Sequence, residues 1–178
     1  TLNRTQNDLK VFFFDVNTGG RHLLFEEKSG AWIDVFDFFA DVQDYLYFPE
    51  GVRELLWISD RDGRQHIYRY DYDGNLLNQV TQGPWVVTRV DGIDPDTKTI
   101  YYTSTEPSPL ERHLYAVGFD GTGKRRLTQT RGTHSVNLSP NGAFYIDSWS
   151  NLQQPRQVEL WSTDGQKLAT LEDNAITT

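Results

Sequence analysis

A glycine-rich segment of the chain has the outline of a phosphate-binding loop. Residues 118–124 (GFDGTGK) match the first seven positions of a P-loop, in which backbone amides and a lysine hold phosphate groups. Arg125 stands where a Ser or Thr should follow the lysine, and the flanking residues indicate strands on both sides. Without a helix N-terminus there is no dipole or row of free amides for phosphate. We therefore interpret the segment as a hairpin turn.

Two acidic segments resemble fragments of calcium-binding loops. Residues 60–63 (DRDG) and 71–74 (DYDG) each supply two carboxylates and a glycine. Calcium takes roughly six to eight oxygen ligands, and neither segment continues to the further ligands. Asp-Gly is also a favoured hairpin turn, because glycine takes a positive φ at little cost. We expect turns here and no metal site.

The histidines do not form a metal or catalytic motif. The chain contains His22, His66, His113 and His134. None has the H-E-x-x-H spacing of a zinc site, and no Gly-x-Ser-x-Gly nucleophile elbow occurs anywhere. His66 and His113 stand at equivalent places just before a predicted strand, which favours a role in the packing of a repeat.

The remaining polar motifs are weak. One predicted loop contains four acids, Asp34, Asp37, Asp41 and Asp44. Two of them could act as a general acid and a general base, but scattered acids in a loop are usually solvated. Residues 3–5 and 137–139 match the glycosylation sequon. From the residues we therefore predict no catalytic group, no metal and no cofactor in this chain.

Short aromatic and β-branched runs separated by Gly, Pro, Asn and Asp turns predict many strands, and no segment sustains a helical period. Four segments share an aromatic strand followed by a turn that ends in Gly: residues 11–19, 67–74, 114–121 and 158–165. The glycines of successive turns are separated by 54 (Gly20 to Gly74), 47 (to Gly121) and 44 residues (to Gly165). Propeller blades of four strands repeat at roughly 40 to 50 residues.

We therefore predict an all-β fold, a partial β-propeller of about three and a half four-stranded antiparallel blades. Residues 1–178 would form a single propeller segment, too short to close a ring. It would consist of an outer half-blade (9–27) and three blades (29–83, 84–130 and 131–172). Alternate residues of each strand should face a neighbouring sheet. The residues expected to be buried are Leu56, Ile58, Ile67, Tyr101 and Leu114.

Composition excludes some classes of protein. The formal net charge is −8, and the 17 Lys and Arg residues are scattered, so we expect no nucleic-acid partner. The absence of Cys rules out disulfides and Cys-based metal sites. There is also no Met and no targeting segment, which favours an excised piece of a larger protein.

Several longer stretches resemble one known family. They are residues 57–68 (WISDRDGRQHIY), 80–87 (VTQGPWVV), 104–115 (STEPSPLERHLY), 138–142 (LSPNG) and 171–174 (LEDN). They are similar to the propeller domain of the dipeptidyl peptidase IV branch of the prolyl oligopeptidase family, and most of all to its bacterial members. Together they cover most of residues 50–174.

The resemblance implies a non-catalytic part of a serine exopeptidase that releases dipeptides with proline or alanine second. In the family an eight-bladed propeller caps an α/β-hydrolase domain that carries the Ser, Asp and His. That domain is absent from this chain, so we expect it, together with a peptide substrate, as a partner within the parent protein. The segment would form part of the wall of the parent protein's cavity and would filter substrates by size. The resemblance also favours a periplasmic or other extracytoplasmic location.

The resemblance carries over one site residue. In the family, the loop after the outer hairpin supplies an aromatic side chain that borders the substrate pocket, and residues 32–36 (WIDVF) match it. Phe36 is the candidate substrate-binding residue, with Val35 and Phe38 as alternatives, and an aromatic in the blade core is a competing interpretation. The family's paired glutamates lie in an earlier segment, and residues 26–27 (EE) do not match their motif.

Two other interpretations of the function stay open, and the oligomeric state has two possible outcomes. The chain could be a binding module from another propeller family, such as the TolB-like repeats, and a free-standing enzyme is the third interpretation. An incomplete ring leaves two blade faces without partners, so we expect the isolated chain to form a homodimer. The competing outcome is a monomer with frayed terminal blades.

Overall fold

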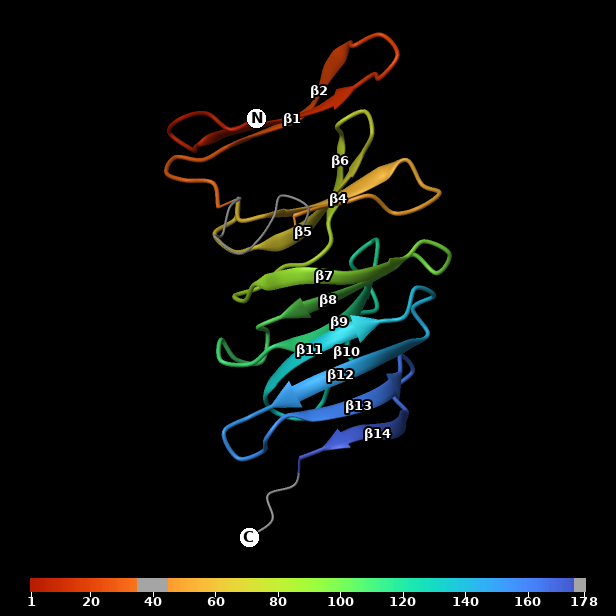
Figure 1. Ribbon diagram of the computed structural model, residues 1–178. Helices are drawn as coiled ribbons and strands as arrows, with labels where there is room; N and C mark the ends of the chain where they lie inside the picture. Colours follow the sequence, from red (N-terminus) through yellow and green to blue (C-terminus); the bar gives the residue numbers. More distant parts are fainter. Residues whose placement is uncertain (35–44, 175–178) are drawn as a thin grey trace. The chain divides into compact units, whose positions relative to one another are not determined.

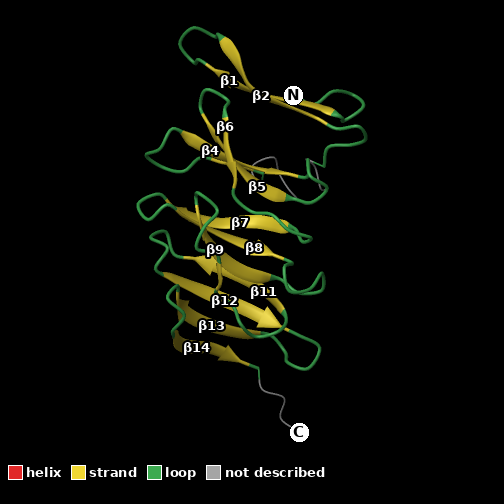
Figure 2. Cartoon of the chain, turned by 180° about the vertical axis from the view of Figure 1, so that it is seen from behind, coloured by secondary structure: helices red, strands yellow, loops and turns green. Residues whose placement is uncertain are grey.

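The computed structural model describes residues 1–34 and 45–174. Within these ranges every regular element is a β-strand, and Figure 2 shows only strands and loops there. No helix in this part of the chain is long and apolar enough to cross a bilayer. Phe36 lies outside the described residues, so its predicted place at the border of a substrate pocket stays a prediction.

The described strands form four antiparallel sheets (Figure 1). The strands are β1 (Asp8–Phe14), β2 (Arg21–Lys28), β3 (Leu46–Tyr47), β4 (Glu54–Ser59), β5 (His66–Asp71), β6 (Leu76–Gln79), β7 (Val87–Asp94), β8 (Thr99–Ser104), β9 (His113–Gly118), β10 (Arg125–Arg126), β11 (Thr133–Leu138), β12 (Phe144–Ser150), β13 (Gln157–Ser162) and β14 (Lys167–Asp173). β1 and β2 form a two-stranded sheet, and β3–β6, β7–β10 and β11–β14 form four-stranded sheets in which sequence neighbours pair. The predicted all-β fold of three and a half blades is confirmed.

The chain divides into two compact units, Thr1–Thr81 and Gln82–Thr178. The first contains the sheets β1–β2 and β3–β6, and the second contains β7–β10 and β11–β14. In the first unit Phe25 of β2 stacks on Tyr70 of β5, with ring centroids 4.5 Å apart. Such an offset aromatic pair adds to the area that the two sheets bury.

The second unit has its core between its two sheets. Tyr101, Leu114, Ala116 and Leu127 come from the β7–β10 side, and they pack with side chains of the β11–β14 sheet, Val136 and Tyr145. In β11 and β12 buried and exposed residues alternate, because one face packs on the neighbouring sheet and the other is open.

The five residues expected in the core are all buried, but the predicted alternation is wrong for the central strands. In β4, β8 and β9 five of the six residues are buried, so burial includes both faces of the strand. A strand that is covered on both faces carries a nearly continuous apolar run, which a period of two does not describe.

A buried histidine–threonine pair recurs at equivalent positions in two blades. Nδ1 of His66 lies 3.2 Å from Oγ1 of Thr81, and Nδ1 of His113 lies 3.0 Å from Oγ1 of Thr128. Each threonine hydroxyl also accepts a backbone N–H from the strand after the histidine, that of Ile67 or Leu114. Both imidazoles are fully buried. The predicted role of these histidines in repeat packing is therefore confirmed.

Candidate functional site

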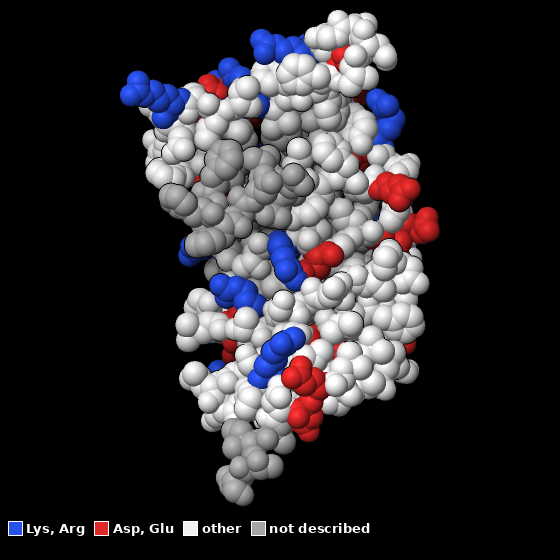
Figure 3. Space-filling view, in the orientation of Figure 1, with Lys and Arg blue, Asp and Glu red and all other residues white. Residues whose placement is uncertain are grey.

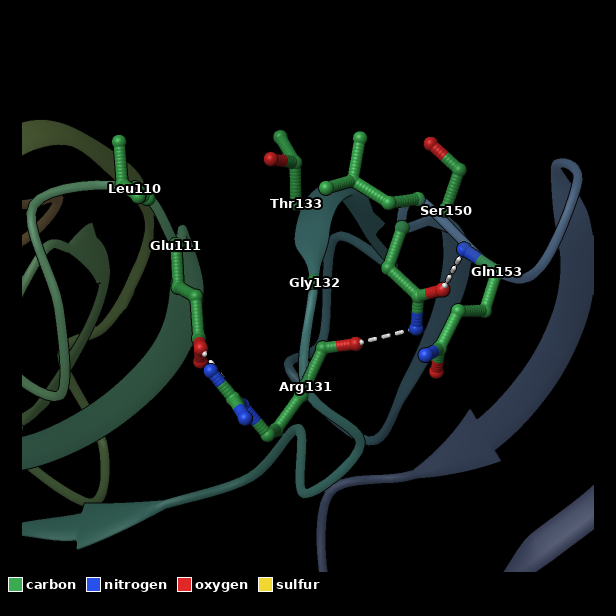
Figure 4. Close-up of a pocket in the computed structure, with 9 residues that line it drawn as sticks. Leu110, Glu111, Arg131, Gly132, Thr133, Ser150 and Gln153 are labelled. Atoms are coloured by element: carbon green, nitrogen blue, oxygen red, sulfur yellow. Dashed lines mark hydrogen bonds and ion pairs between the residues drawn. The ribbon is translucent and has the colours of Figure 1, made fainter.

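An open hollow of about 690 Å³ lies on one rim of the second unit (Figure 4). Three segments line it, and they are far apart in the sequence: residues 110–111 between β8 and β9, residues 131–133 at the start of β11, and residues 150–153 after β12. In antiparallel sheets every second connection returns to the same rim. The connections β8–β9, β10–β11 and β12–β13 therefore meet there (Figure 1).

Backbone hydrogen bonds join the two sheets beside the hollow. The N–H of Arg112 donates to the carbonyl of Gly132 at 3.2 Å, and the N–H of His134 donates to the carbonyl of Arg112 at 3.0 Å. These bonds form a parallel bridge between Arg112 and Thr133. The bridge holds the first two lining segments in a fixed register.

Glu111 is the buried acid of the hollow, with 8 % of its surface exposed. Its Oε2 lies 2.9 Å from Nε2 of His113, and its Oε1 accepts Nε of Arg131 at 3.0 Å. These hydrogen bonds, with that from His113 the stronger, hold the pKa of Glu111 below its ordinary value. The carboxylate thus links a buried imidazole to an exposed guanidinium.

The protonation of His113 follows from its partners. A carboxylate only accepts, so Nε2 carries a proton and donates it to Glu111. Nδ1 lies 3.0 Å from the hydroxyl and 3.2 Å from the carbonyl oxygen of Thr128, so it can accept the hydroxyl proton when the ring is neutral or donate to the carbonyl when the ring is charged. Burial lowers the pKa of His113, against the opposing effect of Glu111. The lowered pKa of His113 favours its neutral imidazole.

A second imidazole lies beside this network. The rings of His113 and His134 have centroids 4.8 Å apart. Nε2 of His134 lies 2.8 Å from the carbonyl of Thr130, and Nδ1 lies 2.7 Å from Oδ2 of Asp147. Since a carbonyl only accepts, Nε2 of His134 carries a proton, and the buried pair with Asp147 fixes the ring in the core.

The loop after β12 is held by one side chain. Nδ2 of Asn151 donates to the carbonyl of Arg131 at 2.9 Å, and its Oδ1 accepts the backbone N–H groups of Gln153 and Gln154. Leu152 in this loop has its full surface exposed, and Leu110, which also lines the hollow, is 85 % exposed. The hollow therefore has two exposed leucines on its margins and an ion pair inside.

The other acidic pair of interest, Glu26 and Glu27, is used by the fold of the first unit. Glu26 pairs with Lys10 and Lys28 at 3.1 Å. Glu27 is buried and accepts hydrogen bonds from three donors: Nε1 of Trp57 at 2.9 Å, Oγ of Ser59 at 2.6 Å and Nη2 of Arg61 at 2.7 Å. Neither carboxylate is arranged to receive a substrate.

The weaker sequence motifs are turns. Residues 118–124 connect β9 and β10, where Oδ1 of Asp120 accepts the N–H of Thr122. Residues 60–63 and 71–74 connect strands β4–β5 and β5–β6. In the described part of the chain no three His, Asp or Glu side chains gather closely enough to hold a metal ion. Sequence reasoning missed the hollow, because its lining residues adjoin only after the two sheets have packed.

Residues 1–156 match the family model described as the dipeptidyl peptidase IV (DPP IV) N-terminal region. The chain belongs to this family. It is 30 % identical over 181 residues to dipeptidyl peptidase 4 of Trichophyton equinum and 31 % identical over 171 residues to that of Arthroderma otae, covering 97 % and 93 % of this chain. The crystal structure of Porphyromonas gingivalis dipeptidyl peptidase 4 matches 97 % of it with a TM-score of 0.85 and 32 % identity.

The chain is short beside these relatives of the dipeptidyl peptidase IV family. It spans 22 % and 21 % of the two fungal proteins and 24 % of the bacterial chain. Since two of these relatives are fungal and one is bacterial, the expected likeness to bacterial members stays a prediction.

Proposed function

We propose that this chain is a non-catalytic propeller segment of a dipeptidyl-peptidase-IV-like serine exopeptidase, and that it forms part of the wall of the cavity that filters and positions peptide substrates. The observation that carries the proposal is membership of the dipeptidyl peptidase IV N-terminal family in a sequence without a nucleophile elbow. Covalent peptide hydrolysis needs an activated nucleophile, and a wall contributes only binding and exclusion. The hydrolase domain of the parent protein would supply the reacting groups.

The rim that carries the hollow supports the proposed wall. It offers apolar surface at Leu110 and Leu152 together with hydroxyl and amide groups at Thr133, Ser150 and Gln153. A mostly apolar concavity with a few polar groups is the usual character of a ligand surface. Basic and acidic side chains are interspersed on the face shown in Figure 3, which suits contact with peptides of varied sequence.

The wall is tested in the longer polypeptide of the parent. Leu152→Glu changes the rim, and Thr122→Ala in the β9–β10 turn at the opposite rim is the matched control. We expect Leu152→Glu to change kcat/KM for peptides of ten or more residues. For a Gly-Pro chromogenic substrate, kcat/KM of this variant should stay about the same as that of the unsubstituted parent. Equal effects on both substrates, or none on the long peptides, would contradict the proposed wall.

Phe36 remains the proposed substrate contact. A flat side chain at a pocket border contributes mainly buried apolar area. Phe36→Ala in the parent should therefore raise KM for the Gly-Pro substrate more than the control Phe48→Ala, whose aromatic side chain is half exposed in the first unit. The same KM in both variants would remove Phe36 from the site.

We further propose that the isolated chain forms a homodimer through the outer face of the β11–β14 sheet. Phe144 and Ile146 on this face are 44 % and 40 % exposed, and Ile146 lies opposite Leu160. Exposed apolar sheet faces recruit partners. Light scattering after size-exclusion chromatography should show twice the mass of 20.6 kDa, and Ile146→Lys should give the monomer. A monomer at every concentration would refute the dimer.

A further inference from the structure

The Glu111–Arg131 pair is an addition to the blade repeat. The preceding blade has the same histidine–threonine pair, His66 with Thr81. Two residues before that histidine, however, stands the exposed Arg64, and three residues after that threonine stands Pro84. At these two positions, Glu111 and Arg131 are therefore particular to the second unit's blade.

Keeping a carboxylate buried has a cost that its partners must offset. Glu111 offsets it with His113 on the inside and Arg131 on the outside. A relay of hydrogen bonds thus runs from the hydroxyl of Thr128 through His113 and Glu111 to Nε of Arg131. The relay holds the Nε side of the guanidinium.

The guanidinium of Arg131 still has donor groups that can bind a ligand. Among the described residues only Glu111 bonds it, through Nε, and the Arg131 side chain is 89 % exposed. Its two terminal NH₂ groups are open toward solvent, and a guanidinium fork matches a carboxylate. The exposed leucines Leu110 and Leu152 line the same hollow as Arg131. In Figure 4 the side chains of Leu110 and Ser150 point the same way, and Glu111 meets Arg131 below them.

From this juxtaposition we propose that the hollow binds an extended peptide segment that carries a carboxylate side chain next to leucine-sized apolar side chains. Arg131 recognises the carboxylate, Leu110 and Leu152 contact the apolar neighbours, and Glu111 with His113 are positioning residues. The inference rests on the proposed function, because the peptide would be a substrate that runs along the wall. It adds to that function a preference for acidic substrates beyond the cleaved dipeptide.

The test uses this chain and two acetylated, amidated pentapeptides, Ala-Leu-Glu-Leu-Ala and Ala-Leu-Gln-Leu-Ala. Calorimetric titration at low ionic strength should show the glutamate peptide binding about fivefold more tightly, the range of an exposed charge pair. The difference should shrink at high salt, because exposed charges are screened. Equal affinities of the two peptides, or no binding of either, would overturn the proposal.

Substitutions of Arg131 and Arg125 distinguish recognition of the peptide carboxylate by Arg131 from an effect of the net charge of the chain. Arg131→Gln should abolish the difference between the peptides, and Arg131→Lys should keep only part of it, because lysine lacks the planar fork. Arg125→Gln makes the same change of net charge elsewhere in the second unit, where Arg125 donates to the carbonyl of Thr163, and should keep the full difference. An equal loss in Arg125→Gln and Arg131→Gln would overturn the proposal.

The peptide-binding test and the kinetic test of the proposed wall can fail independently of each other. If the peptides bind alike but Leu152→Glu still alters long-peptide kinetics in the parent, the wall stands without an acidic preference. If the acidic preference is found but long-peptide kinetics do not change, the hollow binds peptides that are not substrates.

Discussion

Replacing Gly74 with alanine tests how the β5–β6 hairpin packs on β2 in the first unit. Gly74 has φ +88°, and its N–H closes the turn on the carbonyl of Asp71 at 3.2 Å. A Cβ at this position would lie 1.7 Å from the carbonyl oxygen of Leu24. Gly63 is a matched control in the same unit, since it has φ +89°, a similar turn bond to Asp60, and no atom within 4 Å of its Cβ position.

The two substitutions share one cost and differ in the other. Each puts a side chain into the left-handed region, which destabilises the fold by about 1–2 kcal/mol. Gly74→Ala must also displace the backbone of β2 by more than an ångström, and forced repacking of this kind costs about 1–3 kcal/mol more. We therefore expect a total loss of roughly 2–5 kcal/mol for Gly74→Ala, against about 1–2 kcal/mol for Gly63→Ala.

Hydrogen exchange of amides in β4 and β5, followed as a function of urea, measures the free energy of unfolding of this unit separately from the second unit. Gly74→Ala should lower it more than Gly63→Ala by about 1–3 kcal/mol. Equal losses in the two variants would show that the turn does not touch β2, and the packing of the half-blade on the β3–β6 sheet would then be wrong.

The other predictions concern buried groups. Leu114→Ala should cost about 2–5 kcal/mol in urea unfolding of the second unit, because the side chain is fully buried between the two sheets; a loss below 1 kcal/mol, about one methylene, would contradict that packing. Thr81→Val and Thr128→Val should each cost about 1–3 kcal/mol, because both remove the hydroxyl that accepts a buried backbone N–H and lies at Nδ1 of the histidine, and unequal losses would argue against an equivalent role. Burial lowers the pKa of His113 below its ordinary 6.5, so its neutral form stabilises the fold above that pH. Stability should fall as the pH drops below 6.5 toward the folded pKa; Tm measured from pH 8 to pH 5 should fall less in His113→Gln, and an unchanged slope would refute the assignment.

The spacing of turn glycines was sufficient to predict the fold. Gly74, Gly121 and Gly165 each close a turn whose glycine N–H bonds the carbonyl three residues earlier, so a local signal with a fixed φ recurs once per blade. Local rules of this kind can be read from one sequence, because the residues that make the turn are neighbours. The equivalent places of His66 and His113 follow the same repeat and were predicted from it, but their threonine partners, 15 residues further along the chain, were not.

The hollow was not predictable in the same way. Glu111, Arg131 and Asn151 are 20 residues apart in each step, and no pattern within a strand links them. They meet because the N–H groups of Arg112 and His134 tie two sheets together at the rim. Residues that meet through packing between sheets leave no period in the sequence, so the candidate site required the structure.

The period of two failed where burial is greatest. β8 and β9 have buried residues on both faces, whereas β11 and β12 alternate because one of their faces is open. Sequence alternation therefore reports how many faces of a strand are covered and cannot by itself show which neighbour covers them.

The most direct test of the account compares this chain with the longer polypeptide of its parent on a Gly-Pro chromogenic substrate. We predict that the longer polypeptide releases the chromophore and that this chain, at the same molar concentration, does not, because it has no nucleophile elbow. Turnover by the purified chain that is lost when one of its own serines is replaced would contradict the non-catalytic assignment. A longer polypeptide without hydrolase activity would contradict the proposed parent.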